Sequence, residues 1–124
     1  MKLTPVLIVE KIEDSLPFWV ERLAFVKTVE VPEDGRLGFA ILVKDGAEVM
    51  LQTSASVRKD TPQVLANGRN FTALFVEVND VDDVKRRLEG CEVIVTERVT
   101  FYGMREIGYR EPGGHVVVFA ARVG

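Results

Sequence analysis

The sequence contains few of the residues on which disulfides, metal sites and nucleic-acid surfaces depend. Its 124 residues include one cysteine, one histidine and one tryptophan. The single cysteine, Cys91, excludes a disulfide within the chain. The 16 lysines and arginines are outnumbered by 19 aspartates and glutamates, and phosphate binding requires clustered basic residues. We therefore expect no nucleic-acid partner, and we interpret Arg58-Lys59 and Lys85-Arg86-Arg87 as solvated faces.

Long apolar runs are also absent. No stretch approaches the ~20 consecutive apolar residues that a membrane-spanning helix requires. The apolar run within Met1–Glu10 is too short for the hydrophobic region of a signal peptide. Hydrophobic residues nevertheless make up 47% of the chain, which is enough for the core of one globular domain. We expect a soluble, cytoplasmic protein that has no membrane partner.

The clearest periodic pattern predicts a helix from Ile12 to Leu23. Asp14 or Ser15 can cap its start, and Pro17 is tolerable in its first turn. Four apolar residues recur at intervals of three and four, which places them on one face: Leu16, Trp19, Val20 and Leu23. We expect this stripe, including Trp19, to pack in the core and not to contact a ligand.

Strand patterns surround this helix and return in the second half of the chain. The strands expected in the first half are about Leu3–Val9, Phe25–Pro32, Leu37–Val43 and Ala47–Thr53. Those expected in the second half are about Phe71–Val78, Glu92–Thr100, Gly103–Tyr109 and Val116–Ala121. A helix over Val81–Leu88, capped by Asn79 or Asp80, stands in the second half where Ile12–Leu23 stands in the first.

Two alignments indicate that the halves are copies of one module. Val9–Asp14 aligns with Val78–Asp83 at a shift of 69 residues, and Gly46–Leu51 aligns with Gly114–Phe119 at a shift of 68. Anchors that agree within one residue favour a duplicated βαβββ module. We predict one compact α+β domain, with a first module over 1–53, a polar connector over 54–70 carrying at most a short helix, and a second module over 71–124.

These motifs resemble those of the vicinal-oxygen-chelate family, which groups glyoxalases, extradiol dioxygenases, fosfomycin-resistance enzymes and bleomycin-resistance proteins. The resemblance rests on Leu7–Phe25, Phe75–Asp83 and Gly103–Gly114. It implies that two βαβββ modules curl into an eight-stranded open barrel around a cleft, usually in a dimer. Two departures stand out: Ala24 occupies the place of the family's usual glycine, and Glu111 that of its usual aspartate before proline.

The resemblance also identifies the positions where metal-using relatives place their ligands. Here these positions hold Thr4, Met50, Ala73 and Val118, and none of the four supplies an imidazole or a carboxylate. The only histidine, His115, lies an odd number of residues from Val118, so strand alternation places it on the opposite face. We therefore expect no metal and no other cofactor.

Strand alternation then defines the face of the sheets that lines the expected cleft, a mixture of apolar and polar side chains. With the aromatic and methionine residues near the strand ends, the candidate ligand-binding residues are Phe39, Glu48, Met50, Gln52, Phe75, Glu77, Tyr102, Met104 and Val118. Phe39, Phe101 and Tyr102 either stack on a planar ligand or pack in the ordinary way. The methionines would supply an adaptable lining if they face the cleft.

Glu48 and Glu77 are the informative polar pair, because a carboxylate on an apolar concave face costs free energy unless a partner satisfies it. A cationic ligand or an arginine such as Arg105 would do so. Alternatively, both carboxylates lie at the rim, solvated or in salt bridges. They could also act as a general base or hold a metal at shifted positions.

Within the family, the chain most resembles bleomycin-resistance proteins. The shared residues are Pro5–Leu7, Phe18–Val20, Leu23–Phe25, Arg105–Ile107 and Pro112–Gly114. The tryptophans that stack on the drug in those proteins have no counterpart here. The resemblance implies a metal-free homodimer that sequesters an amphipathic, planar or cationic small molecule in a dimer cleft, with a role in antibiotic resistance and no catalytic residues.

Two other readings stay open. One is a metal-dependent lyase, isomerase or dioxygenase of the glyoxalase family that uses unusual ligands such as Glu48 and Glu77. The other is a module whose dimer surface is the functional part.

Overall fold

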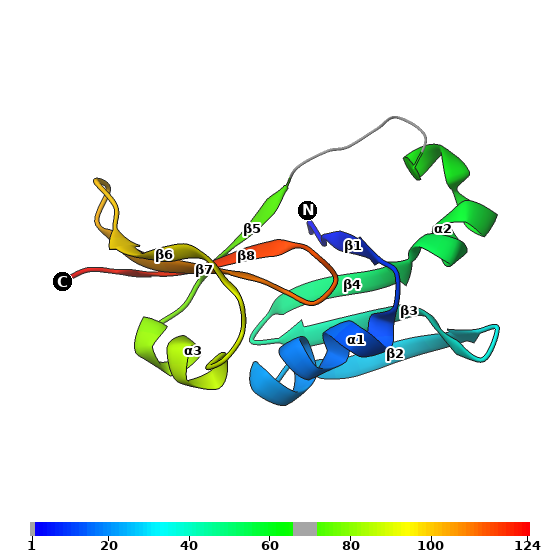
Figure 1. Ribbon diagram of the computed structural model, residues 1–124, viewed down its shortest axis with the longest axis horizontal. Helices are drawn as coiled ribbons and strands as arrows, with labels where there is room; N and C mark the ends of the chain where they lie inside the picture. Colours follow the sequence, from blue (N-terminus) through cyan, green and yellow to red (C-terminus); the bar gives the residue numbers. More distant parts are fainter. Residues whose placement is uncertain (1, 66–71) are drawn as a thin grey trace. The chain divides into compact units, whose positions relative to one another are not determined.

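The computed structural model describes residues 2–65 and 72–124, and the described part contains eight strands and three α-helices (Figure 1). The elements of the first half are β1 (Val6–Val9), α1 (Ile12–Leu16), η1 (Pro17–Arg22), β2 (Val26–Glu33), β3 (Arg36–Lys44), β4 (Ala47–Thr53), α2 (Ser54–Asp60) and η2 (Pro62–Leu65). Those of the second half are β5 (Ala73–Glu77), α3 (Val81–Arg87), β6 (Val93–Val99), β7 (Met104–Arg110) and β8 (Val116–Arg122). None of the described helices is long and apolar enough to cross a membrane.

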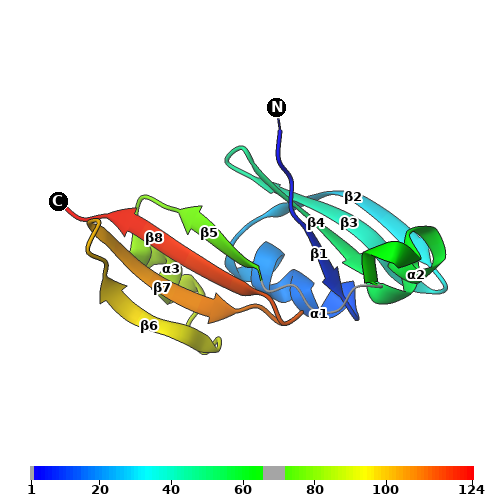
Figure 2. The same ribbon diagram turned by 90° about the horizontal axis from the view of Figure 1, so that it is seen from above.

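The strands form two four-stranded sheets that share one topology. The first sheet has the order β1-β4-β3-β2 and the second the order β5-β8-β7-β6, as Figure 2 shows. In each sheet the first pair of strands is parallel and the other pairs are antiparallel. Val6 pairs with Met50, and Phe75 pairs with Val118, so the pairings are related by shifts of 69 and 68 residues. The α+β class and the two βαβββ modules are confirmed.

The chain divides into two compact units, Met1–Asn70 and Phe71–Gly124. In the first unit, α1 and η1 cover one face of the sheet with apolar side chains. Trp19 is 1% exposed, and its ring meets those of Phe18 and Phe25 edge to face at centroid distances of 5.2 Å. Such pairs add about 0.5–1.5 kcal/mol to the gain from burial. The predicted core position of Trp19 is confirmed.

The helix over Ile12–Arg22 differs from its predicted form in two ways. Lys11, not Asp14 or Ser15, is the N-cap, and its side chain makes no capping hydrogen bond. Pro17 lies beyond the first turn, where it lacks the N–H that an α-helix would use. The helix continues from Pro17 in π form, and the Leu23 N–H donates to the Phe18 carbonyl oxygen at 3.2 Å. A missing donor thus changes the hydrogen-bond pattern without ending the helix.

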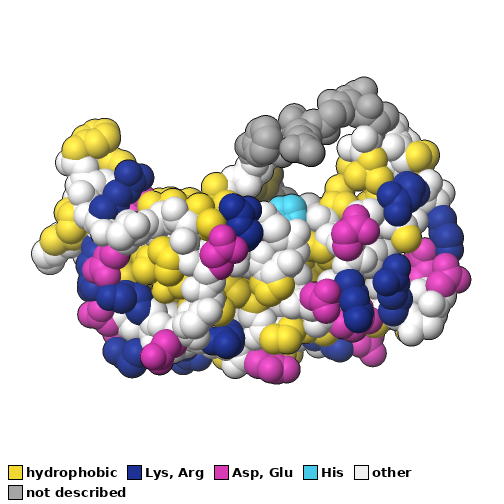
Figure 3. Space-filling view, in the orientation of Figure 1, with side chains coloured by type: hydrophobic (Ala, Val, Ile, Leu, Met, Phe, Trp, Pro, Cys, Tyr) yellow, Lys and Arg dark blue, Asp and Glu magenta, His cyan; other side chains and the backbone are white. Residues whose placement is uncertain are grey.

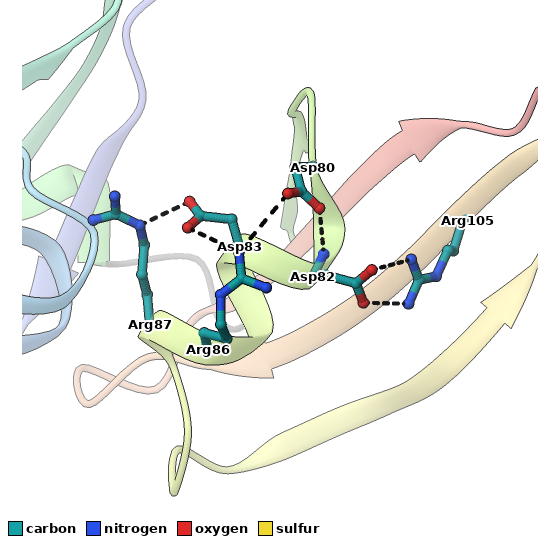
Figure 4. A network of polar contacts seen from close by, with 6 residues as sticks. All are labelled: Asp80, Asp82, Asp83, Arg86, Arg87 and Arg105. Carbon is teal, nitrogen blue, oxygen red and sulfur yellow. Dashed lines mark hydrogen bonds and ion pairs between the residues drawn. The ribbon is translucent and has the colours of Figure 1, made fainter.

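In the second unit, α3 covers one face of the second sheet. The Asp80 carboxylate accepts from the backbone N–H of Asp82 at 2.9 Å, so Asp80 is the cap among the two candidates that the sequence offered (Figure 4). The buried side chains of α3 and its C-cap, Val81, Val84 and Leu88, follow the predicted stripe. On the sheet, the rings of Tyr109 and Phe119 lie 6.1 Å apart, and burial raises the pKa of the Tyr109 hydroxyl.

The polar stretch that follows β4 begins with a short helix, α2. The Thr53 hydroxyl accepts from the Ser56 N–H at 3.1 Å and caps α2, so this short helix begins directly after the strand. Val57 of α2 is 1% exposed, which makes α2 part of the first unit. The last residues of the predicted connector, 66–70, and the predicted strand start at Phe71 lie outside the described residues.

Ala24 has a backbone conformation that suits glycine. Its φ is +64°, in the left-handed region where a Cβ costs roughly 1–2 kcal/mol. We expect Ala24→Gly to stabilise the protein by roughly 0.5–1 kcal/mol, because the relieved strain exceeds the added entropy of the unfolded chain. Urea denaturation measures the difference. Ala121→Gly in β8 is the matched control and should destabilise; equal losses in both variants would contradict the prediction.

Candidate functional site

Each sheet has one face against its own helix and a second face turned away from it, which we call the distal face. On the first sheet, Met50 lies between Val6 and Ile41, and Gln52 lies between Ile8 and Phe39. Most of these side chains are half-buried, and Val6 is 46% exposed. Four predicted ligand residues, Phe39, Glu48, Met50 and Gln52, therefore share the distal face of one unit.

Polar groups on this face are already satisfied by the first unit. Glu48 accepts a hydrogen bond from the Thr4 hydroxyl at 3.0 Å and pairs with the Lys2 ammonium at 3.1 Å. The hydrogen bond from Lys2, and then that from Thr4, lowers the pKa of the Glu48 carboxyl. Gln52 donates from Nε2 to the Ser56 hydroxyl at 3.1 Å. Glu48 is therefore in a salt bridge, as one of the interpretations of this carboxylate expected.

The distal face of the second sheet carries Phe75, Glu77 and Val118 among the predicted residues, besides Met104 near the β6–β7 turn. Phe75 pairs with Val118, and Glu77 pairs with Ala120 in the neighbouring row. Phe75 is 54% exposed, and Glu77 is also exposed. Beyond Val118 the same row continues with Gly108 and then Val95. A Cβ on Gly108 would stand 2.9 Å from the Val95 Cβ, so only glycine lets the Val95 side chain lie against the sheet here.

Sequence analysis missed a buried carboxylate on this face, that of Glu106. The Glu106 residue is 3% exposed. Its Oε2 accepts from Nε of Arg98 at 3.0 Å and lies 2.9 Å from the Arg98 Nη2. Its Oε1 accepts from the Tyr102 hydroxyl at 3.3 Å. Arg98 and Glu106 stand at equal distances from the β6–β7 turn, and opposite charges facing each other across a hairpin were the available signal.

The remaining predicted residues lie around the β6–β7 turn. Tyr102 is 51% exposed, whereas Met104 pairs with Arg122 on the distal face and is only 4% exposed. Phe101 is fully exposed and meets the Tyr102 ring edge to face at 5.1 Å. The Phe101 ring therefore packs on its neighbour Tyr102 and is not part of the core. Figure 3 shows hydrophobic side chains gathered at the tip of this hairpin.

Arg105 does not satisfy the carboxylates that the sequence suggested. It pairs with Asp82 of α3 at 2.7 and 3.2 Å (Figure 4). Its Nε also donates to Glu97. The hydrogen bond from Lys85, and then that from Arg105, lowers the pKa of the Glu97 carboxyl. Alternation along β7 explains why Arg105 does not reach Glu77. Arg105 points to the helix side of the sheet, while its neighbour Glu106 points to the distal side.

The residues at the four family metal positions do not fit a divalent metal. The Thr4 hydroxyl donates to Glu48, and the thioether, methyl and isopropyl groups of Met50, Ala73 and Val118 are poor or impossible ligands. Among residues 2–65 and 72–124, no group of three or more histidine, cysteine, aspartate or glutamate side chains is arranged to hold a metal ion. No metal-dependent step follows from these positions.

Comparison with known proteins agrees with this fold. The family model of the Glyoxalase/Bleomycin resistance protein/Dioxygenase superfamily matches residues 3–119. The structure of TioX from Micromonospora sp. ML1 is similar, with a TM-score of 0.81, 20% identity and 99% of each chain covered. A family enzyme from Burkholderia phytofirmans PsJN has a TM-score of 0.78 at 11% identity, with 97% of each chain covered.

A third similar structure is that of a glyoxalase/bleomycin resistance protein/dioxygenase from Nocardioides. Its TM-score is 0.73 at 19% identity, and the match covers 99% of this chain and 84% of that one. Comparison with curated proteins gave no match. At these identities, the similar structures establish the fold but not the function.

The contacts of Glu48 predict how its carboxyl group titrates. Carbon-detected NMR titration should give a pKa below the usual glutamate value, because Lys2 and Thr4 favour the charged form. Lys2→Ala should move the pKa of Glu48 back toward that usual value, and Thr4→Ala should move it less. Lys11→Ala is the matched control and should leave it unchanged. An unaltered Glu48 pKa in Lys2→Ala would contradict the salt bridge.

Proposed function

The chain belongs to the Glyoxalase/Bleomycin resistance protein/Dioxygenase superfamily, and on that premise we propose that it binds a small amphipathic or planar molecule without a metal ion. The observation that carries the proposal is the chemistry of the distal faces. The central positions where the resemblance implies metal ligands hold apolar side chains, such as Met50 and Val118. Ligand sites of this kind are mostly apolar and contain a few oriented polar groups.

Exposure supports this proposal. Folded chains rarely leave large connected apolar patches open to water unless the patch contacts a ligand or a partner. On the first sheet, Val6, Val29 and Val31 are each more than 40% exposed, and Phe39 and Ile41 lie between them in the pairing register. On the second sheet, Phe75 offers a half-exposed ring. A planar molecule laid against either face would remove apolar surface from water.

The polar groups refine which ligand fits. Lys2 already neutralises Glu48, so this carboxylate does not require a cation from the ligand. Glu77 is exposed, and water can solvate it. A strongly cationic ligand, as the resemblance to bleomycin-resistance proteins would imply, therefore has little support from the first sheet. The proposal also includes a homodimer that sequesters the ligand in a cleft between its subunits. It further includes a role in antibiotic resistance and a cytoplasmic location.

The alternative, a metal-dependent lyase, isomerase or dioxygenase, gains no specific support. It needs Glu48 or Glu77 as ligands, and Glu48 is engaged by Thr4 and Lys2. Glu77 is paired in register with Ala120 on the other sheet, next to Phe75 and Val118, and these neighbours supply no further donor to a metal.

Binding by the distal face predicts a loss of affinity when an exposed ring is removed. Isothermal titration against a panel of aromatic and amphipathic compounds should give saturable binding for some members. Phe75→Ala should weaken that binding about tenfold, since it removes stacking and apolar contact area. Val93→Ala is the matched control, because Val93 is 48% exposed but pairs with Tyr109 in the register of the helix side. Equal effects of both variants would argue against the distal face.

The metal-free part of the proposal has its own measurement. Elemental analysis of protein purified without chelators should find zinc, nickel, manganese and iron far below one equivalent per chain. Treatment with EDTA should leave ligand affinity unchanged, because the central positions offer no donors. Stoichiometric metal whose removal abolishes binding or an activity would favour the enzyme alternative.

A further inference from the structure

We propose that Arg98 binds an anionic group of the ligand, so that the ligand is an aromatic or amphipathic carboxylate. This inference rests on the proposed function and adds the chemical class of the molecule. It starts from the contrast between the two members of the Arg98–Glu106 pair. The Glu106 side chain is 4% exposed, whereas that of Arg98 is 63% exposed. The pair therefore presents its positive member to solvent.

The contact between these residues leaves most of the guanidinium available. Nε of Arg98 donates to Oε2 of Glu106 at 3.0 Å, and Nη2 lies 2.9 Å from the same oxygen. A guanidinium has five N–H donors in a planar fork, so two are directed to Glu106. The N–H groups on Nη1 and the outer one on Nη2 have no partner among the described residues. Two such groups match the two oxygens of a carboxylate.

Glu106 also holds Arg98 in place before any ligand arrives. A buried carboxylate is costly unless its partners stay close, and removing one partner leaves an uncompensated charge. The Tyr102 hydroxyl, which donates to the other carboxylate oxygen at 3.3 Å, further fixes Glu106. An arginine that is already oriented loses less conformational freedom on binding.

The surroundings of Arg98 favour an anion with an apolar body. Arg98, Glu106 and Ala120 form one row across the sheet, and the row beside it holds Val95, Gly108, Val118 and Phe75. On the other side, Arg122 pairs with Met104. The row of Arg98 ends in Glu77 on β5, three strands from Arg98 and thus about 14 Å from it by ordinary strand spacing. With Glu106 counted against Arg98, Arg122 leaves this end of the face with one net positive charge, although the whole chain has a net charge of −3.

Three probes with one ring system test the proposal: naphthoate, the neutral naphthamide and the cationic naphthylmethylammonium, each titrated at neutral pH. We expect the intact protein to bind naphthoate at least about tenfold more tightly than naphthamide, as charge-assisted bidentate hydrogen bonds allow. Arg98→Gln should abolish this preference while keeping the affinity for naphthamide. Arg58→Gln removes the same charge from the exposed surface of α2 and should keep the preference.

The Arg98→Gln substitution removes the charged partner of Glu106, and an unpaired buried carboxylate destabilises the folded protein. Thermal unfolding is therefore followed for every variant. The double variant Arg98→Gln with Glu106→Gln removes both charges and should fold normally, bind naphthamide and show no preference for naphthoate. A preference that survives in the double variant, or its absence from the intact protein, would overturn the role of Arg98. Tightest binding of the ammonium probe would also overturn it, while leaving the proposed function intact. Failure of the intact protein to bind any of the three probes would count against the proposed function and with it the inference.

Discussion

The alternation of side chains across the strands is the constraint on which the rest of this structure depends. Every second residue of a strand points to the same face, so one register decides what is buried and what is presented. In β1, Leu7 and Val9 are 6% and 2% exposed, whereas Val6, which precedes Leu7 and points to the opposite face, is 46% exposed. A slip of one residue would place the core side chains in water and bury the candidate site.

Alternation also places charged residues with different contacts on opposite faces of the second sheet. On the helix side of the second sheet, Arg105 joins β7 to α3 through Asp82, a structural contact. Its neighbour Glu106 faces the other way and holds Arg98. Glu48 has a comparable arrangement on the first sheet with Lys2. Glu48, which looks available for chemistry in the sequence, is therefore engaged by partners, and Arg98 is the oriented charged side chain that we propose for a ligand.

The two modules share a fold and differ in what their distal faces offer. Val6–Met50 and Phe75–Val118 are equivalent pairs, which shows how closely the backbones correspond. The first face is apolar, with its one strand carboxylate neutralised by Lys2, and the second adds the Arg98–Glu106 pair. The two modules thus repeat one scaffold, while their distal faces differ in the side chains they present, and only the second face carries the arginine that we propose binds an anion.

The sequence by itself determined the elements, because hydrophobic periodicity and turn residues are local signals. It placed β4 at Ala47–Thr53, Trp19 and Leu23 in the core, Asp80 among two candidates for the cap of α3, and the repeat of one βαβββ module. It also placed Phe39, Met50, Phe75 and Val118 on the faces turned away from the helices.

Only the tertiary structure decided which side chains meet. Lys2 reaches Glu48 and Arg98 covers Glu106, while Arg105 turns to Asp82. The π form after Pro17 and the burial of Met104 also lay beyond sequence patterns. Partner choice among charged side chains depends on distances in space between segments far apart in the chain, and composition and spacing do not contain those distances.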